Sequence, residues 1–289
     1  MVPTKERNVP AVFLKYKSEG ILFDCGEGTQ RQMNITGINR NKVTKILLTH
    51  WHGDHVSGVI GLLQTIGNRE INPKIMIFGP KGTKKRVKCL MDSIYFDVQV
   101  NLKIVEIDEK KPKTVFNGKE FKIVAANMVH NTPCISYAFI EKDRRNIDKD
   151  FLKKNKIGPG PHLKQLSAGK SITYKGKEID VNKATYVIKG KKISYVVDTE
   201  VCNNAIEIAE GSDILICEST YSSKLANKAR EFRHMTSKDA AMIANKANVK
   251  KLILTHFSQR YKNCLEIQED AQTYFDNVIC AEDFMKISL

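Results

Sequence analysis

Four metal-ligand side chains follow a strand-like segment and set the strongest limit on how this chain folds. In the run LLTHWHGDHVSG, the residues His50, His52, Asp54 and His55 precede an apolar, helix-like segment. Imidazole nitrogens and a carboxylate at the end of a strand suit borderline cations such as zinc. Their directions diverge too much for one tetrahedral ion. We therefore expect them to divide between two adjacent ions, each completed by residues from elsewhere in the chain.

Candidates for those further ligands stand at the ends of other strand-like segments. His130 lies just past a strand in AANMVHNTP, Asp198 ends ISYVVD and His256 ends KLILTH. A lone histidine is more often structural than a ligand, but the cluster needs ligands from outside itself. Strands that finish in such residues predict one rim of a layered sheet, where loops gather a two-metal site. His162 has no place in this scheme and is interpreted as incidental surface.

Strand-like and helix-like segments alternate along the chain, which predicts an α/β layered domain. Residues 11–16 and 21–26 look like a hairpin joined by KSEG, and Ser237 is the expected N-cap of a helix over residues 237–248. A second helix is expected over residues 205–212. Further short apolar runs predict buried strands over residues 45–50, 74–79, 103–107, 193–198, 213–219 and 251–256.

Positive charge is concentrated in one stretch of the chain. Residues 141–192 carry 15 Lys and Arg against 6 Asp and Glu, a net of +9, whereas the whole chain has a formal charge of +15. Within it, Gly158, Pro159, Gly160 and Pro161 forbid a continuous helix or a central strand. We interpret this stretch as a protruding basic insertion that favours a polyanionic partner. The alternative is an ordinary basic surface loop.

The length and composition of the chain indicate its size class and the cellular compartment in which we expect it. The 289 residues suffice for one large core or two modest domains, and no apolar run approaches the roughly 20 residues of a membrane span. The start, MVPTKERNVP, lacks the apolar core of a signal peptide. Seven scattered cysteines without a C-x-x-C pair suit free thiols in a reducing cytosol. We therefore expect a cytoplasmic protein that is not inserted in a membrane.

Several motifs together resemble ribonuclease Z (tRNase Z), a branch of the metallo-β-lactamase superfamily, nearly from end to end. They are PTKERN, LFDCGEGTQRQM, LTHWHGDHVSGVIGLL, GPKGT, the GPGP run and LTHFSQRY. The resemblance implies a single metallo-β-lactamase domain over residues 1–289, a four-layer αβ/βα sandwich, with an inserted flexible arm over 142–180 that binds tRNA. It also implies a zinc-dependent endoribonuclease that cuts the 3′ trailer from precursor tRNA. The products would be a tRNA 3′-hydroxyl and a trailer 5′-phosphate.

The same resemblance implies roles for individual residues. One zinc ion would be held by His50, His52 and His130, and the second by Asp54, His55 and His256, with Asp198 bridging the two. Asp54 would also act as general base. Asp24, in LFDCGEG, matches an acidic residue behind the metal site, with a simple turn-forming role as the alternative.

Two further motifs match catalytic accessories of the family. His234 in FRHMTS and Glu218 in ICESTY match a general acid and its carboxylate partner. The residues around them depart from the family pattern at Cys217, Ser219 and Met235. The roles of Glu218 and His234 are therefore expected on the strength of these two side chains alone.

The family resemblance also bears on assembly and on the start of the chain. It implies a homodimer in which the arm of one subunit serves the active site of the other. Members usually open with a strand ending in Phe-Leu-Gly-Thr, whereas here Met1 stands directly before Val-Pro-Thr-Lys. Either a start codon lies further upstream or this outer strand has been lost.

Two other functions are compatible with parts of the sequence. A thioesterase or a small cyclic-phosphodiester hydrolase of the same superfamily would share the metal ligands but has no need of a strongly basic insertion. An RNA-binding protein with an inactive site would be expected to have lost ligands, and here every ligand position is filled.

Overall fold

The computed structural model describes residues 2–67, 72–95 and 100–289. The chain divides into two compact units, each described by itself. The first unit comprises Met1–Asn117, Ile123–Phe139 and Lys192–Leu289, and the second comprises Gly118–Lys122 and Ile140–Lys191. Among the described helices, none combines the length and the apolar character that crossing a lipid bilayer requires.

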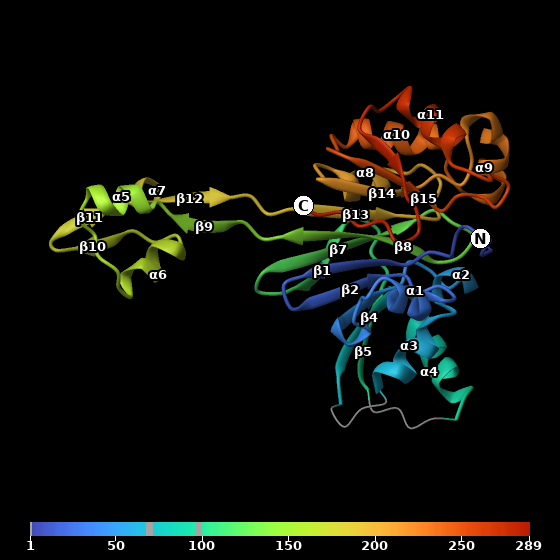
Figure 1. Ribbon diagram of the computed structural model, residues 1–289, viewed down its shortest axis with the longest axis horizontal. Coiled ribbons are helices and arrows are strands. Elements are labelled where there is room, and N and C mark those ends of the chain that lie inside the picture. Colours follow the sequence, from blue (N-terminus) through green and yellow to red (C-terminus); the bar gives the residue numbers. More distant parts are fainter. Residues whose placement is uncertain (1, 68–71, 96–99) are drawn as a thin grey trace. The chain divides into compact units, whose positions relative to one another are not determined.

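Two sheets form the centre of the first unit (Figure 1). The first has the order β1-β2-β3-β4-β5; β1 and β2 form an antiparallel hairpin, and β2 to β5 run parallel. The second has the order β16-β15-β14-β13-β8-β7-β6, with β13 to β16 parallel. The bounds of the first sheet are β1 Val12–Tyr16, β2 Glu19–Phe23, β3 Val43–Leu47, β4 Lys74–Pro80 and β5 Asn101–Ile107. Those of the second are β6 Lys113–Asn117, β7 Phe121–Met128, β8 Cys134–Glu141, β13 Lys192–Val196, β14 Ile214–Glu218, β15 Leu252–Thr255 and β16 Val278–Cys280.

The two sheets pack face to face through aromatic side chains. Phe23 of β2 lies 6.4 Å from the Tyr137 ring of β8 and 5.4 Å from the Tyr195 ring of β13, measured between ring centroids. All three rings are fully buried. The Tyr137 hydroxyl donates to the Leu48 carbonyl at 2.7 Å, which satisfies its polar atom inside the core.

Helices cover the outer face of each sheet. The five-stranded sheet is flanked by α1, α3 and α4, and the seven-stranded sheet by α8, α10 and α11 (Figure 1). This gives the four-layer αβ/βα sandwich that the family resemblance implies and confirms the metallo-β-lactamase fold class. The helices of this unit are α1 Thr29–Ile35, α2 Gly53–Val56, α3 Val59–Gly67, α4 Thr83–Asp92, α8 Asn203–Ala209, α9 Ala226–Phe232, α10 Ser237–Lys246 and α11 Leu265–Gln272, with short 3-10 turns at Arg40–Lys42 and Ser223–Leu225.

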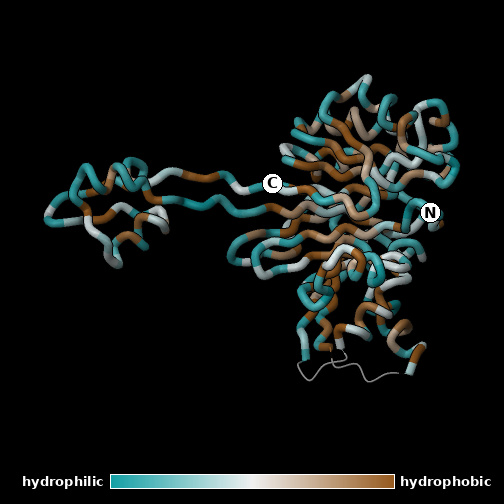
Figure 2. The backbone as a smooth tube through the Cα atoms, viewed as in Figure 1, coloured by the Kyte–Doolittle hydropathy of each residue, from teal (hydrophilic) through white to brown (hydrophobic). Residues whose placement is uncertain are grey.

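Parallel strands buried on both faces account for the apolar runs in the sequence. In Figure 2 many of these strands appear in the brown of hydrophobic residues. The predicted hairpin and all the predicted strands are present, each within a few residues of its expected bounds. The main difference lies at their carboxyl ends, because β2, β13 and β15 stop before Asp24, Asp198 and His256 rather than including them.

The predicted cap of the last long helix was wrong by one residue. Thr236, not Ser237, is the N-cap of α10. The Thr236 hydroxyl accepts from the Asp239 amide while the Asp239 carboxylate accepts from the Thr236 amide, a reciprocal capping box. Ser237 is instead buried in the first turn, where its hydroxyl donates to Asp270.

The second unit has a small core of its own. Its elements are β9 Arg144–Ile147, α5 Lys149–Lys154, α6 His162–Ser167, β10 Ile172–Tyr174, β11 Lys177–Ile179, α7 Val181–Ala184 and β12 Thr185–Ile188. Strands β9 and β12 pair antiparallel, as do β10 and β11. The core gathers Ile157, Leu166, Ile172, Ile179, Val181 and Ala184. Residues 158–161 separate α5 from α6, as the glycines and prolines there predict.

His162 has a structural role that its sequence context did not reveal. Its ring is half-buried and lies 4.8 Å from the Tyr174 ring, measured between centroids. Its Nε2 atom also makes a 3.0 Å hydrogen bond with the Gly158 carbonyl. The interpretation of His162 as incidental surface was therefore wrong, because the ring holds the turn over residues 158–161 against β10.

Candidate metal centre

Three of the predicted site residues follow strand ends in a left-handed backbone conformation. Asp24, Asp198 and His256 have φ angles of 54°, 53° and 58°. This region is uncommon for residues other than glycine, and such strain concentrates at functional sites. The left-handed residue turns the chain sharply as it leaves the strand. Each carboxylate or imidazole therefore lies at the rim of a sheet, as the sequence predicts.

The structure brings one predicted set of ligands together. The potential ligand atoms of His50, His52, His130 and Asp198 all lie within 4.8 Å of one another. His50 Nε2 is 2.8 Å from His52 Nδ1 and 3.4 Å from Asp198 Oδ2. His130 Nε2 is 3.8 Å from Asp198 Oδ2. These spacings match several ligands arranged around one point.

The second predicted set also converges, and Asp198 faces both sets. The ligand atoms of Asp54, His55 and His256 lie within 4.8 Å of one another. His55 Nε2 is 3.3 Å from His256 Nε2 and 3.5 Å from Asp54 Oδ2. Asp198 presents Oδ1 to His256 Nε2 at 3.1 Å and Oδ2 to the first set. We call these residues the metal cluster: His50, His52, Asp54, His55, His130, Asp198 and His256.

The donor atoms of the cluster fit a bound cation. Within the described part of the chain, the buried Nε2 atom of His130 has no hydrogen-bond partner. Buried nitrogens that approach one another as closely as those of His50 and His52 need a proton or a cation between them. Burial lowers the pKa of His50 to about 2, so its ring is neutral and able to donate a lone pair. The cluster is therefore a candidate metal site on geometry and chemistry alike.

Burial and neighbouring charges shift the pKa values of the cluster residues in opposite directions. Burial alone would lower the pKa of His55, but the Asp198 and Asp24 carboxylates beside it raise that pKa to about 9. Burial would also raise the pKa of Asp54, yet its hydrogen bond with His256 and the neighbouring His55 hold it below its ordinary value. The carboxylates thus supply the negative charge that a divalent ion requires.

Asp24 lies behind the cluster, as predicted, and orients it. This fully buried carboxylate contacts His55 Nδ1 at 2.8 Å through Oδ2. It also accepts from the Thr49 amide at 2.8 Å and from the Tyr195 hydroxyl at 3.1 Å. A carboxylate on the far nitrogen of a ligand imidazole fixes the tautomer and direction of the ring. A turn-forming role alone therefore does not account for Asp24, because its carboxylate also contacts a histidine of the metal cluster.

Glu218 and His234 form a pair beside the cluster. His234 Nδ1 is 2.9 Å from Glu218 Oε2, and Glu218 Oε1 accepts from the Thr199 amide at 2.6 Å. Burial would lower the pKa of His234, but the Glu218 carboxylate raises it to about 9. The His234 ring lies 5.2 Å from that of His130 and 5.4 Å from that of His256, between centroids. Geometry also makes Asp198, His234 and His256 a third possible ligand group.

Several supporting residues were not found from the sequence. The Thr49 hydroxyl contacts Asp24 and, at 3.1 Å, His50 Nδ1. The Thr220 hydroxyl joins Glu218 Oε2 at 2.7 Å to His256 Nδ1 at 3.1 Å. Thr49 stands directly before a ligand histidine, and Thr220 lies two residues after Glu218. A threonine close to a predicted ligand or a predicted catalytic residue was the only signal available.

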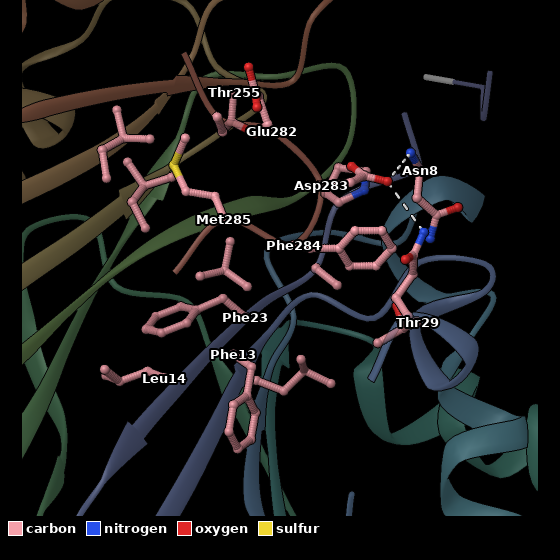
Figure 3. Close-up of a pocket in the computed structure, with 18 of the residues that line it drawn as sticks. Asn8, Phe13, Leu14, Phe23, Thr29, Thr255, Glu282, Asp283, Phe284 and Met285 are labelled. Atoms are coloured by element: carbon pink, nitrogen blue, oxygen red, sulfur yellow. Dashed lines mark hydrogen bonds between the residues drawn. The ribbon is translucent and has the colours of Figure 1, made fainter. Parts of the chain in front are cut away.

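Two motifs far apart in the sequence meet in the first unit. Arg7, in PTKERN, donates from Nη2 to the Tyr261 carbonyl at 2.6 Å, in the LTHFSQRY motif. Asn8 donates its backbone amide to the Asp283 carboxylate at 2.9 Å (Figure 3). The amino-terminal segment is thus tied to the loop that follows His256.

A largely apolar cavity of about 320 Å³ lies in the same region. Figure 3 shows Phe13, Leu14, Phe23 and Met285 at its lining, with Asp283 at its polar end. Of the metal cluster, His256 alone contributes to this lining. The cavity is partly open to solvent, because Phe284, Met285 and Ile287 in its lining are exposed.

Comparison with known proteins assigns the class and then the family. Residues 4–82 match the model of the metallo-beta-lactamase superfamily, which fits a four-layer fold with a His and Asp cluster at its rim. The chain is 37% identical to ribonuclease Z of Archaeoglobus fulgidus, over 100% of this chain and 94% of that one. It is 38% identical to ribonuclease Z of Nanoarchaeum equitans, over 91% of this chain and 82% of that one. The chain belongs to the ribonuclease Z family.

A solved structure of similar fold supports this assignment. The crystal structure of human tRNase Z, short form, matches with a TM-score of 0.71 at 26% identity, covering 99% of this chain and 94% of that one. The sequence motifs that resemble ribonuclease Z therefore occur in a chain that has the fold of that family.

Proposed function

We propose that this protein is a metal-dependent endoribonuclease that removes the 3′ trailer from precursor tRNA. The observation that carries the proposal is the convergence of all seven predicted ligands in one cluster, in a chain of the ribonuclease Z family. The complete ligand set argues against an RNA-binding protein with an inactive site. Family membership and the basic second unit argue against a thioesterase or a small cyclic-phosphodiester hydrolase.

The residues support a pair of zinc ions. His50, His52 and His130 would hold one ion, and Asp54, His55 and His256 the other, with Asp198 shared through its two oxygens. Imidazole-rich sites with few carboxylates suit zinc better than the hard cations magnesium and calcium. Zinc ions held there would lower the pKa of a bound water and would offset the negative charge that builds up on a phosphate during displacement.

The chain's own residues would direct the proton transfers. Asp54 would orient the attacking water and accept its proton, since its carboxylate lies within the cluster, 3.5 Å from His55 Nε2. Glu218 engages His234 through Nδ1 and leaves Nε2 as the atom that can protonate the departing ribose 3′-oxygen. In-line attack on phosphorus with loss of that oxygen yields a tRNA 3′-hydroxyl and a trailer 5′-phosphate.

RNA binding would rest on the basic stretch. The proposed arm, residues 142–180, falls within the second unit, whose lysines are largely exposed. Proteins recognise folded RNA chiefly through its backbone and hydroxyl groups, which exposed cations can contact without reading sequence. We include in this proposal a cytoplasmic homodimer in which each arm serves the active site of the partner subunit.

One experiment tests the reaction. Purified protein is incubated with a 5′-labelled precursor tRNA, with added zinc or after removal of metal by a chelator, and the product is sized. Cleavage at the trailer junction with zinc, absent after chelation and restored by zinc, is the expected result. A protein that hydrolyses bis(p-nitrophenyl) phosphate but leaves precursor tRNA intact would be a different hydrolase of the superfamily.

A further inference from the structure

The single tryptophan of the chain lies within the metal cluster sequence. Trp51 stands between the ligands His50 and His52 and is partly exposed. Its indole Nε1 donates to the Thr83 hydroxyl at 2.9 Å, and the Arg86 guanidinium carbon lies 5.9 Å from the ring centroid. Both partners belong to α4. The partly exposed indole also packs against the hydrophobic core of the first unit, so it is held next to this helix, one residue away from two residues of the metal cluster.

The helix beside Trp51 carries a cluster of cations that its own stability does not explain. Lys84, Lys85, Arg86 and Lys88 are exposed, and Asp92 is the one acidic residue of α4. Three of these cations lie near the amino-terminal end, where the helix dipole disfavours positive charge. Within the described part of the chain, the α4 lysines Lys84, Lys85 and Lys88 form no ion pair. A polyanion on this face would offset the repulsion.

The backbone at the start of α4 is already occupied. The Glu106 carboxylate accepts from the amides of Gly82 and Lys84, both at 2.9 Å. A phosphate therefore has no open amide at either of these positions. An anion on this face must therefore be held by the exposed lysine side chains.

We propose that Trp51 and the lysines of α4 form a binding surface for the single-stranded RNA next to the scissile phosphate. An unpaired base stacks on the Trp51 indole, and the backbone phosphates on either side pair with Lys84, Lys85 and Lys88. Stacking on an aromatic ring needs an unpaired base but no particular sequence, which suits a cut beside a tRNA of any identity. This inference rests on the proposed function and specifies how the strand enters the metal cluster.

Intrinsic fluorescence reports on this surface directly, because Trp51 is the only tryptophan. Zinc-loaded protein is titrated with an unstructured RNA octamer that carries phosphorothioate linkages to resist cleavage. A second octamer has the same charge but no bases. The first should quench the emission to saturation. The second should bind with a similar salt dependence and leave the emission almost unchanged. Saturated binding of the base-containing octamer without a change in emission overturns the stacking.

Variants separate the ring from the charges. Trp51→Ala should raise the Kd of the octamer, measured by anisotropy of a labelled strand, about fivefold to a hundredfold, whereas Trp51→Phe should restore most of the affinity. The zinc content of both variants is measured, because residue 51 lies between two ligands. Equal affinity of the alanine variant and the native protein at full zinc content would contradict the proposal.

Charge reversal provides an independent test. The double variant Lys84→Glu/Lys85→Glu should flatten the slope of log Kd against log salt by about 1.4. The matched control is Lys74→Glu/Lys103→Glu, which changes the same charge at exposed positions near the opposite end of β4 and β5. This control should leave the slope unchanged. The same flattening in both double variants would show that only net charge matters.

Cleavage of precursor tRNA by the native protein is measured alongside. If the octamer behaves as expected but precursor tRNA is not cut, the proposed function is contradicted, whereas the RNA-binding surface is still supported. If precursor tRNA is cut but the emission and the salt slope do not respond, this inference alone fails.

Discussion

The metal cluster and the basic second unit show opposite ways of using polar side chains. His50 and His55 are fully buried, Asp198 is 2% exposed, and each has hydrogen-bond or charge partners at short range. The lysines of the second unit lie largely in solvent, and the ion pair between Lys189 and Asp143 is on the surface. Such exposed pairs contribute little to stability.

This difference predicts two kinds of effect when residues are substituted. A buried cluster fixes atoms to within fractions of an ångström, and its disruption should appear in metal content and in kcat. Solvated cations attract a polyanion without fixed geometry, and their removal should appear in KM and in salt dependence. The predictions below either break this separation or define it more closely.

The largest effect is expected from the shared carboxylate. Asp198→Ala should lose both ions, from about two zinc per chain to nearly none, and reduce turnover to that of chelated enzyme, because each ion loses a ligand. His130→Ala is the control and should lower zinc content less. The measurement is zinc per chain by elemental analysis after gel filtration. Full zinc occupancy in the Asp198→Ala protein would contradict the bridging role.

The next largest effect concerns the leaving group. His234→Ala should lower kcat on precursor tRNA by about 10²- to 10⁴-fold while zinc content stays the same, because the ribose oxygen departs without a proton. Bis(p-nitrophenyl) phosphate provides the control, since p-nitrophenolate leaves without protonation. Equal decreases on both substrates, or a fall in zinc content, would instead place His234 among the ligands.

Removing the arm should act on binding. Because β9 pairs with β12, the deletion that respects the fold runs from Arg144 to Ile188, bridged by a Gly-Ser linker. At physiological salt, kcat/KM on precursor tRNA should fall about a hundredfold, and its salt dependence should flatten by about 0.7–0.9 log units for each phosphate that the arm neutralises in the native protein. Hydrolysis of bis(p-nitrophenyl) phosphate should persist, because it depends on the metal cluster.

A full-length variant distinguishes charge from shape in the arm. Replacing five lysines by glutamine should reproduce most of the change in salt dependence without removing the small core of the second unit. These are Lys153, Lys154, Lys156, Lys164 and Lys170. An arm-deleted protein that processes precursor tRNA at the native rate, with the native salt slope, would show that the arm is only a basic loop.

The smallest effect is expected behind the cluster. Asp24→Asn should weaken zinc binding about 10- to 100-fold, because the amide cannot hold His55 Nδ1 as firmly as a carboxylate does. Tyr195→Phe, which removes one hydrogen bond to the same oxygen, should do less. Competition with a zinc chelator measures both. Unchanged zinc affinity in Asp24→Asn would leave Asp24 with a structural role only.

Local patterns in the sequence predicted a layered α/β domain and the candidate ligands, whereas the four-layer arrangement and the assignment of each ligand to one of two ions came from the family resemblance. Apolar runs mark strands buried on both faces, and ligand residues after those runs predict a common rim. The capping box of α10 shows where this reasoning falls short. Thr236 and Ser237 are both good caps, but only Thr236 has an acidic residue three positions later to complete a capping box, and Ser237 is engaged by Asp270 instead.

Contacts between distant residues could not be predicted. The interaction of Asp24 with Tyr195 joins residues 171 positions apart, and Thr220 meets His256 across 36 positions. His162 was interpreted as incidental surface because it had no place among the predicted ligands, and its contact with Tyr174 in β10 depends on the folded arm. Such pairs depend on how strands and helices pack, which no short pattern records.

The most direct test of the account follows an oxygen atom. Precursor tRNA is cleaved by zinc-loaded protein in ¹⁸O-labelled water, and both products are analysed by mass spectrometry. The account predicts one ¹⁸O in the 5′-phosphate of the trailer and an unlabelled 3′-hydroxyl on the tRNA, since water attacks phosphorus and the ribose oxygen departs. A tRNA ending in a 3′-phosphate or a 2′,3′-cyclic phosphate would contradict it.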